Sequence, residues 1–553
     1  MDRMCAIHMP RRSYRHGPQT SIYPYSTLSE VFDATAKRLP NKTAVIVYQS
    51  RAERECWTFS ELQIKSIALA SALHQRGYKR GDRMAIFAPN CSEYLPVVIA
   101  LSRIGCNAFL FSNLNSLVGD VEQYACRALV MYVGTIKERK ACEEIAKTTT
   151  QIITFGPNSV GIAGSSVCLS TLVEEGHALG YHQLPAAENF TPDDPLFVFL
   201  TSGSTGKPKC VQYTHSSFLR FSSFSKTMAV TEDSCFFNDR PMTWIGGMNT
   251  LLTIAVFGAT SITMNTALVV SERDVDCVMG ILKTERCTHA VMMHYFMVDL
   301  LARDDPSLLD VPSLQYILTG GQILDMNVAK DIMLLFPHAK HMINGYGSTE
   351  VGVASIRQFT GKPCSEYMVI SEGVEIKLID ENGLDVPPDT EGELCIRSPW
   401  ILPKCYVDNE EASRKAYDGT GWFHTSDIAI MNTDGEIKIC GRKDDMIKRA
   451  TIKVFPAEVE NVISEHPAVK QVVVVGVPDA RLGEELCACV VLNEGCEAKG
   501  LQEWCKDHFS VGPDGMSLAP KYFVVCTDFA TTVTGKTDRK SVRQLAMKKL
   551  NMQ

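Results

Sequence analysis

Thr201-Ser202-Gly203-Ser204-Thr205-Gly206-Lys207-Pro208-Lys209 is a turn-forming segment that directly follows an apolar run at 196–200. Its nine residues include four hydroxyls, two glycines and two lysines. Glycines let backbone N–H groups approach an anion closely, hydroxyls donate hydrogen bonds, and lysines supply positive charge. A turn of this composition at the end of a predicted strand favours a binding site for a polyphosphate.

Two other interpretations compete for the same turn. A Walker A loop needs four residues between its glycines and a Ser or Thr after its lysine. Here two residues separate Gly203 from Gly206, and Pro208 follows Lys207. The next residues, 209–213, predict a strand rather than the helix that a Walker loop requires. A Walker-type NTPase is therefore excluded, while a plain Gly/Ser linker stays open for this segment taken alone.

Upstream of the turn, predicted helices and strands alternate along the chain. Residues 26–38 predict a helix with Thr27 or Ser29 near its cap, and 92–103 predict another after Pro89-Asn90. The apolar runs that predict strands lie at 83–88, 128–132, 151–154 and 196–200. This alternation predicts an α/β fold: a large N-terminal body of several subdomains, built on mostly parallel sheets that helices cover.

Near residue 440 the pattern becomes that of a compact α+β unit. Its predicted elements are a helix at 456–465, strands at 472–475 and 486–492, a helix at 501–509 and a strand at 522–526. A glycine and four consecutive charged residues precede it at 441–445. We therefore expect four parts, namely a tail at 1–24, a body at 25–440, a hinge at 441–446 and a small mobile lid at 447–553.

Composition and charge exclude several functions. Of the 553 residues, 45% are hydrophobic and 21% charged, which is typical of a soluble globular protein. The net charge is −8, so the chain lacks the clustered basic residues that a nucleic-acid partner requires. The most apolar segment, 94–111, is interrupted by Pro96 and Arg103 and falls short of the about 20 residues that span a membrane. We expect neither nucleic acid nor a transmembrane segment.

The 20 cysteines form no CxxC pair, and the closest two, Cys487 and Cys489, fit one face of a strand. Zinc sites usually show paired short spacings, so we expect buried free thiols in a reducing compartment. The N-terminus lacks the apolar core of a secretory signal but holds four arginines within residues 1–15. A mitochondrial transit segment and a short cytoplasmic tail both fit this start, so the compartment stays open between mitochondrion and cytoplasm.

Further motifs follow the turn, and each is weak alone. In Asn344-Gly345-Tyr346-Gly347-Ser348-Thr349-Glu350 the aromatic ring suits a purine and Glu350 is an oxygen ligand suited to Mg²⁺, although Gly-Tyr-Gly is usually a simple turn. Asp427, at the end of the segment 421–427, has the two acceptors that a ribose diol needs, although a solvated turn is the commoner reason for such an Asp. The segments 441–445 and 534–536 are, taken singly, charged turns.

Taken in order, these motifs resemble those of the adenylate-forming superfamily, which includes acyl-CoA synthetases, adenylation domains of peptide synthetases and firefly-type luciferases. The resemblance covers residues 25–545. It assigns the phosphate loop to 201–209 and the adenine and magnesium motif to 346–350. The other positions that match are Gly320, Gly321 and Gln322 beside the adenine and acyl pockets, Asp427 at the ribose, Arg442 at the nucleotide, Asp444 at the hinge and Lys536 as the catalytic lysine.

A closer resemblance is to medium-chain acyl-CoA ligases of the acyl-CoA synthetase family member 2 type, carried by the segments 483–489 and 13–17. It implies activation of a medium-chain fatty acid by ATP to acyl-AMP with release of pyrophosphate, followed by thioester formation with coenzyme A. Lys536, Glu350 and Thr205 would be catalytic, and Glu350 would hold Mg²⁺. Trp244 and His294 would lie at the acyl pocket, although core packing explains Trp244 equally well and is the preferred interpretation of His294.

Three positions depart from the family's pattern. Thr451 stands five residues before Pro456, where relatives have Gly, Ser426 precedes the ribose-binding Asp where Gly is usual, and Ile323 replaces a common Pro. A side chain at residue 451 would narrow the path of coenzyme A. Two alternatives therefore stay open, a luciferase-like monooxygenase acting on an adenylated acid, and a nucleotide-binding protein defective in the thioester step. We expect no fused carrier domain, and the sequence does not name the acid.

Overall fold

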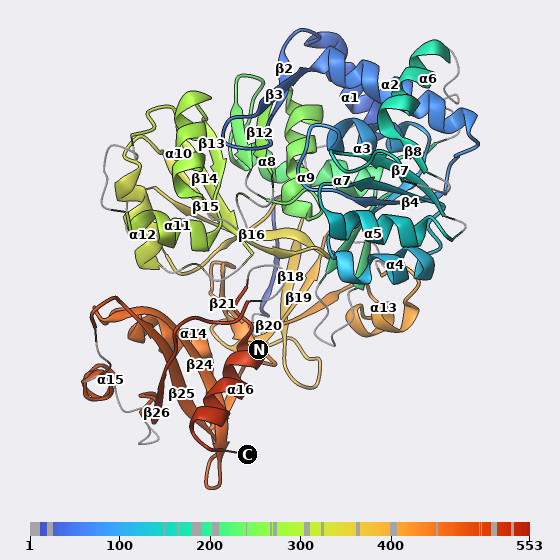
Figure 1. Ribbon diagram of the computed structural model, residues 1–553. Helices are drawn as coiled ribbons and strands as arrows, with labels where there is room; N and C mark the ends of the chain where they lie inside the picture. Colours follow the sequence, from blue (N-terminus) through green and yellow to red (C-terminus); the bar gives the residue numbers. More distant parts are fainter. Residues whose placement is uncertain are drawn as a thin grey trace, which may run out of the picture.

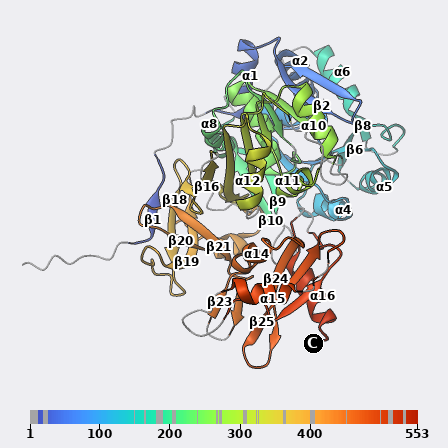
Figure 2. The same cartoon turned by 90° about the vertical axis from the view of Figure 1, so that its left-hand side faces the viewer.

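The computed structural model describes residues 12–18, 26–148, 150–162, 166–179, 190–201, 209–238, 240–265, 268, 274–303, 310–321, 324, 326–360, 365–398, 406–449, 452–496, 498, 500–509, 517–531 and 536–552. A large N-terminal body carries a small C-terminal domain below it in Figure 1 and Figure 2. The body contains three sheets and the small domain a fourth, so the predicted α/β class with an added α+β lid is confirmed.

The first sheet has seven strands in the order β10-β9-β5-β4-β6-β7-β8. All neighbours pair in parallel except β9 and β10. Its strands are β4 (Arg83–Phe87), β5 (Asn107–Phe111), β6 (Ala128–Tyr132), β7 (Gln151–Phe155), β8 (Ser166–Cys168), β9 (Pro195–Thr201) and β10 (Lys209–Thr214). The associated helices are α2 (Phe59–Gln75), α3 (Tyr94–Arg103), α4 (Leu114–Gln123), α5 (Ile136–Ile145) and α6 (Leu169–Leu179). The predicted strands and the helix at 92–103 are confirmed within a few residues.

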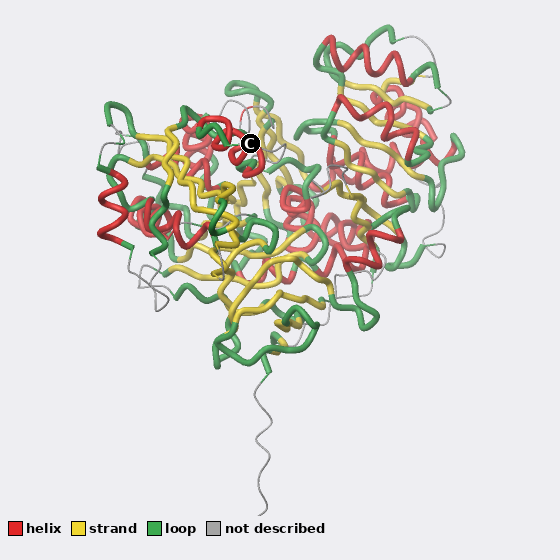
Figure 3. The backbone as a smooth tube through the Cα atoms, turned by 90° about the horizontal axis from the view of Figure 1, so that it is seen from below, coloured by secondary structure: helices red, strands yellow, loops and turns green. Residues whose placement is uncertain are grey.

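The second sheet has nine strands in the order β17-β16-β15-β14-β13-β11-β12-β2-β3 and is parallel in its middle. Its strands are β2 (Thr43–Tyr48), β3 (Arg54–Thr58), β11 (Cys235–Asn238), β12 (Thr260–Met264), β13 (His289–Val291), β14 (Tyr316–Gly320), β15 (His341–Ser348), β16 (Gly352–Phe359) and β17 (Val369–Ile370). Its helices are α1 (Leu28–Arg38), α7 (His215–Arg220), α8 (Ser223–Thr227), α9 (Ile245–Leu252), which continues as a π-helical turn (Thr253–Phe257), α10 (Val275–Thr284), α11 (His294–Leu301) and α12 (Met326–Leu335). Figure 1 shows α10, α11 and α12 on the outer side of β13, β14 and β15, and Figure 3 shows the helices and strands of the molecule from below.

The third sheet is antiparallel, in the order β1-β18-β19-β20-β21, and was not predicted. Its strands are β1 (Tyr14–His16), β18 (Glu375–Ile379), β19 (Glu391–Arg397), β20 (Phe423–Met431) and β21 (Ile437–Arg442), and α13 (Glu410–Ala416) precedes β20. The expected tail at 1–24 is wrong for 12–18, because β1 pairs with β18 and Ser13 is fully buried. A three-residue edge strand has too little alternation to be recognised from sequence.

The small domain begins just after the predicted hinge. β21 ends at Arg442 and β22 begins at Ile447, so residues 443–446 connect body and lid. Its elements are β22 (Ile447–Arg449), β23 (Ile452–Val454), α14 (Pro456–Ile463), β24 (Val469–Asp479), β25 (Gly483–Leu492), α15 (Leu501–His508), β26 (Tyr522–Val525) and α16 (Arg539–Lys549). The predicted helices and strands of this unit are confirmed, although β24 is longer than expected.

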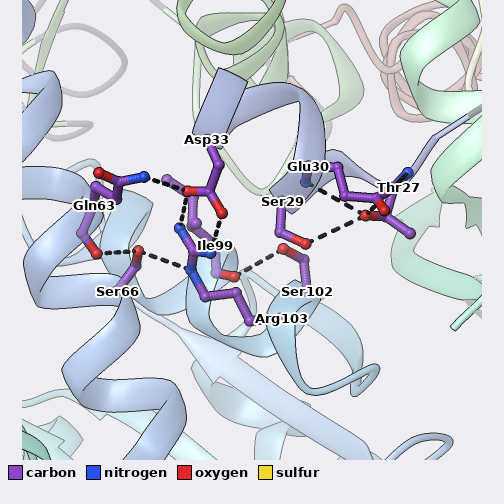
Figure 4. Close-up of polar contacts among 9 residues, drawn as sticks. All are labelled: Thr27, Ser29, Glu30, Asp33, Gln63, Ser66, Ile99, Ser102 and Arg103. Carbon is purple, nitrogen blue, oxygen red and sulfur yellow. Dashed lines mark hydrogen bonds and ion pairs between the residues drawn. The ribbon is translucent and has the colours of Figure 1, made fainter. Parts of the chain in front are cut away.

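An ion pair between a buried arginine and a partly exposed aspartate joins the first three long helices of the body (Figure 4). Arg103 on α3 is 5% exposed at its side chain and donates two hydrogen bonds, each 2.6 Å, to the Asp33 carboxylate on α1. Its Nε also donates to Ser66 on α2, where Gln63 donates to the same carboxylate. Each of the three guanidinium nitrogens of Arg103 therefore donates to an oxygen, as a buried charge requires.

Two further expectations concern cysteines and membranes. Each of the 17 cysteines in the described ranges is a free thiol, and Cys487 and Cys489 are both buried on β25. Within the described part of the chain, no cluster of three or more His, Cys, Asp or Glu side chains could hold a metal ion. The described helices include none that is long and apolar enough to cross a bilayer, and residues 94–111 form α3 and β5 in the core.

Candidate active site

One large cleft, of about 2110 Å³, lies between the body and the small domain. Its walls come from the second and third sheets, from the ends of β9 and β10, and from the segment that precedes α16. The predicted site residues that line it are Thr201, Lys209, Trp244, His294, Gly320, Gly321, Asn344, Gly345, Tyr346, Gly347, Ser348, Thr349, Glu350, Asp427, Arg442 and Lys536. Residues that are 200 positions or more apart in the sequence therefore line the same cleft.

The glycine-rich turn connects two antiparallel strands. β9 ends at Thr201 and β10 begins at Lys209, and these two residues pair directly across the ladder. The Thr201 hydroxyl donates to the Lys209 carbonyl at 3.3 Å. A strand follows the turn, as predicted, rather than the helix of a Walker loop. Ser202, Gly203, Ser204, Thr205, Gly206, Lys207 and Pro208 lie outside the described residues, as do Gln322, Ile323 and Thr451.

Two tyrosines hold the segment that contains Glu350. The Tyr406 hydroxyl donates to Glu350 Oε1 at 2.8 Å, and the Lys209 ammonium lies 4.8 Å from the centre of the same ring. From β10, the Tyr213 hydroxyl donates to the Thr349 carbonyl at 2.8 Å. Tyr406 therefore links the predicted metal ligand to a lysine of the phosphate turn. Neither tyrosine belongs to a motif, so sequence analysis missed both.

Asp427 lies at the centre of a second polar group. It accepts a 2.5 Å hydrogen bond from the Tyr346 hydroxyl, and Arg442 Nε lies 3.4 Å from its other oxygen. β20 and β21 pair Asp427 directly with Arg442, which explains the contact. Burial raises the pKa of Asp427, while Tyr346 and Arg442 oppose that rise. The pKa of Tyr346 is raised as well, first by burial and then by the Asp427 charge.

Ser426, beside this aspartate, has a left-handed backbone with φ of +59°. Its carbonyl accepts a hydrogen bond from Lys443 N at 2.8 Å, which ties β20 to the start of the hinge. Glycine adopts this conformation without steric cost, whereas other residues pay about 1 kcal/mol or more. The preference for Gly at this position therefore has a physical basis, and this chain keeps the conformation with a serine.

Lys536 reaches the cleft from the small domain. Its side chain stays in contact with solvent, but the cleft walls surround it. Partial desolvation, first, and the charges of Arg442 and Arg240 lower its pKa, while Asp427 and Glu350 act in the opposite direction. An ammonium group with a lowered pKa beside two further cations marks a space suited to anions.

The hinge is tied to the segment that carries this lysine. Arg539, the first residue of α16, donates to both carboxylate oxygens of Glu460 at 2.7 Å and to the Val474 carbonyl at 3.0 Å. Its Nε lies 3.9 Å from Asp445. Asp444 lies between β21 and β22 and does not line the cleft, whereas Asp445 does. Arg539, three residues after Lys536, thus contacts Asp445 of the hinge.

The apolar side of the cleft lies at the ends of β11 and β13. Trp244 directly precedes α9, and His294 is the first residue of α11. Both are half-buried and line the cleft, as do Met293 and Tyr295. Met292 is fully buried in the core and does not line it. Arg240, four residues before Trp244, also lines this side, and no motif had identified it.

A large α/β body and a small α+β lid that bring a lysine, two arginines and a glutamate to one cleft define the class of adenylate-forming ligases. Comparison with known proteins supports this class. The model of the AMP-binding enzyme family matches residues 32–406, and that of the AMP-binding enzyme C-terminal domain matches residues 458–536. The chain belongs to the AMP-binding enzyme family.

Three similar proteins extend over nearly the whole chain. "Medium-chain acyl-CoA ligase ACSF2, mitochondrial" of Danio rerio is 26% identical over 600 aligned residues, covering 99% of this chain and 94% of that protein. "Medium-chain fatty-acid–CoA ligase" of Escherichia coli (strain K12) is 27% identical over 552 residues, covering 98% and 93%. The solved structure of the anthranilate CoA ligase AuaEII in complex with anthranoyl-AMP has a TM-score of 0.81 at 20% identity, covering 96% of this chain and 99% of that chain.

Proposed function

We propose that this enzyme activates a medium-chain carboxylic acid through the residues gathered in the cleft. The chain is an AMP-forming acid–CoA ligase that uses ATP, Mg²⁺ and coenzyme A. The observation that carries the assignment of residues is that Lys536 of the lid lines the same cleft as Lys209, Glu350 and Asp427 of the body.

In the first half-reaction, an oxygen of the substrate carboxylate attacks the α-phosphorus of ATP. The bond from that phosphorus to the bridging oxygen breaks, and pyrophosphate leaves with the electron pair. A carboxylate and a polyphosphate repel each other, so the protein must place positive charge between them. Lys536 does this: two opposite unit charges about 4 Å apart attract by roughly 4 kcal/mol at an effective dielectric constant near 20.

The nucleotide is held by residues from the second and third sheets. Gly320, Gly321, Gln322, Asn344, Gly345, Tyr346, Gly347, Ser348 and Thr349 form the adenine side. Asp427 accepts hydrogen bonds from the ribose diol, and Arg442 lies beside it. Support comes from the pairing of Asp427 with both Tyr346 and Arg442, which fixes its carboxylate at the cleft wall. Buried carboxylates that keep acceptor capacity suit a neutral diol.

The β- and γ-phosphates belong to the turn from Thr201 to Lys209, with Thr205 and Lys207 among its contacts. Mg²⁺ fits beside Glu350, since this ion is usually bound by one or two carboxylates together with substrate phosphates and water. Glu350 is the carboxylate that Tyr406 orients next to Lys209. When bound, the ion would neutralise charge on the phosphates, and Glu350 would supply a carboxylate ligand that Tyr406 holds in position.

In the second half-reaction, the thiol sulfur of coenzyme A attacks the acyl carbon, and AMP leaves. Asp444 is the proposed hinge residue about which the lid turns, because it lies in the short connection between β21 and β22. Rotation would withdraw Lys536 and present another face of the lid. Trp244 and His294 are proposed to bound the acyl chain, and the names of the two ligases with 26% and 27% identity support a medium-chain acid.

The deciding experiment measures pyrophosphate release by the full chain with ATP, Mg²⁺ and a panel of short, medium and aromatic acids, with and without coenzyme A. We expect release with an eight- to ten-carbon acid, and an acyl-CoA product when the thiol is present. Pyrophosphate release without any thioester product would show that the enzyme catalyses only the adenylation step. Turnover that requires O₂ instead of coenzyme A would support the monooxygenase, and failure to bind ATP would refute the proposal.

For the compartment, we propose the mitochondrion on the printed name of the Danio rerio relative, with the cytoplasm as the alternative. Import of the full chain into isolated mitochondria, followed by protease protection, distinguishes them. Protection from the protease supports the mitochondrion, and complete digestion supports the cytoplasm.

A further inference from the structure

Arg240 occupies a rigid position between β11 and α9. Its N–H donates to Asn238 Oδ1 at 3.1 Å, and its carbonyl accepts from Asn90 Nδ2 at 2.9 Å. Both asparagines are almost fully buried, at 0% and 1% exposure. Two buried amides thus fix the backbone of this residue, so the direction in which its side chain leaves the loop is set by the core.

The side chain extends along the wall of the cleft toward Gly320. Its Nη2 donates to the Gly320 carbonyl at 3.4 Å, at the end of β14. Glycine at residue 246 makes room for it, because a Cβ there would lie 2.9 Å from Arg240 Cδ. The guanidinium therefore lies between the loop that carries Trp244 and the loop after β14, on the acyl side of the cleft.

Arg240 and Lys536 face the same space from opposite domains. The Arg240 charge is one of those that lower the pKa of Lys536. The residues of the phosphate turn, Thr201 and Lys209, belong to the other α/β sheet, whereas Arg240 shares its loop with Trp244. Arg240 therefore lies on the side of the cleft that carries Trp244, on a different sheet from the phosphate turn.

We propose that Arg240 binds the carboxylate of the acid substrate and orients it for attack, while Lys536 bridges that carboxylate to the α-phosphate. A guanidinium presents two parallel N–H donors that match a carboxylate, whereas an ammonium is a point charge that fixes no orientation. The inference rests on the proposed function. It assigns to this residue a role that ends once the acyl adenylate forms, because the acyl group then carries no charge.

Steady-state pyrophosphate release by the full-length R240Q variant tests this role, with acid and ATP varied separately. We expect the KM for the acid to rise by about 30-fold, while the KM for ATP changes less than about 3-fold, since only a contact to the acid is lost. R240K keeps the charge without the fork and should recover part of the loss. R414Q is the matched control, because Arg414 also lines the cleft but is exposed on α13, and we expect it to behave like the unchanged protein.

A second readout separates this role from a structural one. With chemically prepared acyl adenylate and coenzyme A, R240Q should form thioester within about 2-fold of the unchanged protein, because no carboxylate is present. Loss of this step as well would overturn the inference, as would an unchanged KM for the acid or a loss confined to the KM for ATP. If the unchanged protein releases no pyrophosphate with any acid, the proposed function fails; if it does and R240Q matches it, only this inference fails.

Discussion

The Asp33–Arg103 joint in the body and the cleft below it both contain arginines, carboxylates and buried polar atoms, but they arrange them differently. In the joint, Arg103 meets a carboxylate in two hydrogen bonds and a serine in a third, all within the body. In the cleft, desolvation first, and then the charges of Arg442 and Arg240, lower the pKa of Lys536. Charges that balance within the protein hold helices together, whereas an excess of one sign prepares a site for a ligand of the other.

The largest expected effect is the loss of stability caused by D33A, which removes the carboxylate of the Asp33–Arg103 ion pair. Removing this carboxylate leaves the Arg103 guanidinium buried without its counter-charge, which typically costs about 3–5 kcal/mol. Urea and thermal unfolding should show the loss, while kcat per folded molecule stays unchanged. D276A is the control, because Asp276 pairs with Arg303 at the surface and both are more than 40% exposed. Equal losses in the two variants would contradict the distinction.

For K536A in the cleft, we expect a loss of activity without a loss of stability. Adenylation should slow by roughly 10²–10³-fold, comparable with the loss of one preorganised donor at a developing charge. The unfolding midpoint should stay the same or rise, since a cation among cations is removed. Pyrophosphate release measures the first and urea unfolding the second. Unchanged pyrophosphate release would remove Lys536 from the mechanism.

Buried His215 predicts how the body responds to acid. Its Nδ1 accepts from Leu28 N at 3.1 Å, and burial lowers its pKa to about 4, with Asp194 and Glu30 opposing. Unfolding restores the ordinary pKa of about 6.5. The folded form resists protonation of His215. The contribution of neutral His215 to the free energy of unfolding is therefore complete above pH 6.5. It is lost as the pH falls toward 4, by up to about 1.4 kcal/mol per pH unit.

Unfolding free energies measured between pH 7 and pH 4 check this dependence. H215Q keeps an acceptor for Leu28 N but does not titrate, so its stability should fall less steeply over that interval. H177Q, at an exposed position on α6, serves as the control and should keep the full slope. Equal slopes for H215Q and the unchanged protein would assign the acid sensitivity to other groups.

The smallest effect concerns strain within the cleft. S426G should stabilise the protein by about 0.5–1 kcal/mol, because glycine accepts φ of +59° without steric cost. S426A keeps a Cβ and should give no gain. The midpoint of urea unfolding distinguishes them. A destabilised S426G would show that hydrogen bonds of the serine side chain outweigh the backbone cost.

The parts of the fold that were predicted share a clear periodic signal. The apolar strands β4, β6 and β9 and the capped helix α1 each carry enough residues to reveal their spacing, and the small domain repeats the pattern in compact form. The antiparallel sheet was not predicted, because β1 is only three residues long and the buried positions of β20 and β21 do not alternate regularly. The chain's own N-terminal strand was taken for part of a tail for the same reason.

Within the site, the sequence identified residues that stand in motifs and missed those that support them. Tyr406, Tyr213 and Arg240 belong to no short pattern, and their importance comes from contacts with residues distant in the chain. From the sequence, Trp244 was equally consistent with the core and His294 was more consistent with it, and only the structure places both at the cleft.

The composition of the turn at 201–209 indicated a polyphosphate site, and the order of the motifs, through their resemblance to the adenylate-forming superfamily, indicated the class of chemistry. The sequence by itself also set the division into body and lid, since a change of periodicity is a local property. Only the tertiary structure decided which side chains share a space: the pairing of β20 with β21, the contact of Arg240 with Gly320 at the end of β14 and the approach of the lid are long-range events. The balance of charges in the cleft depends on the distances between these residues, and those distances exist only in the folded chain.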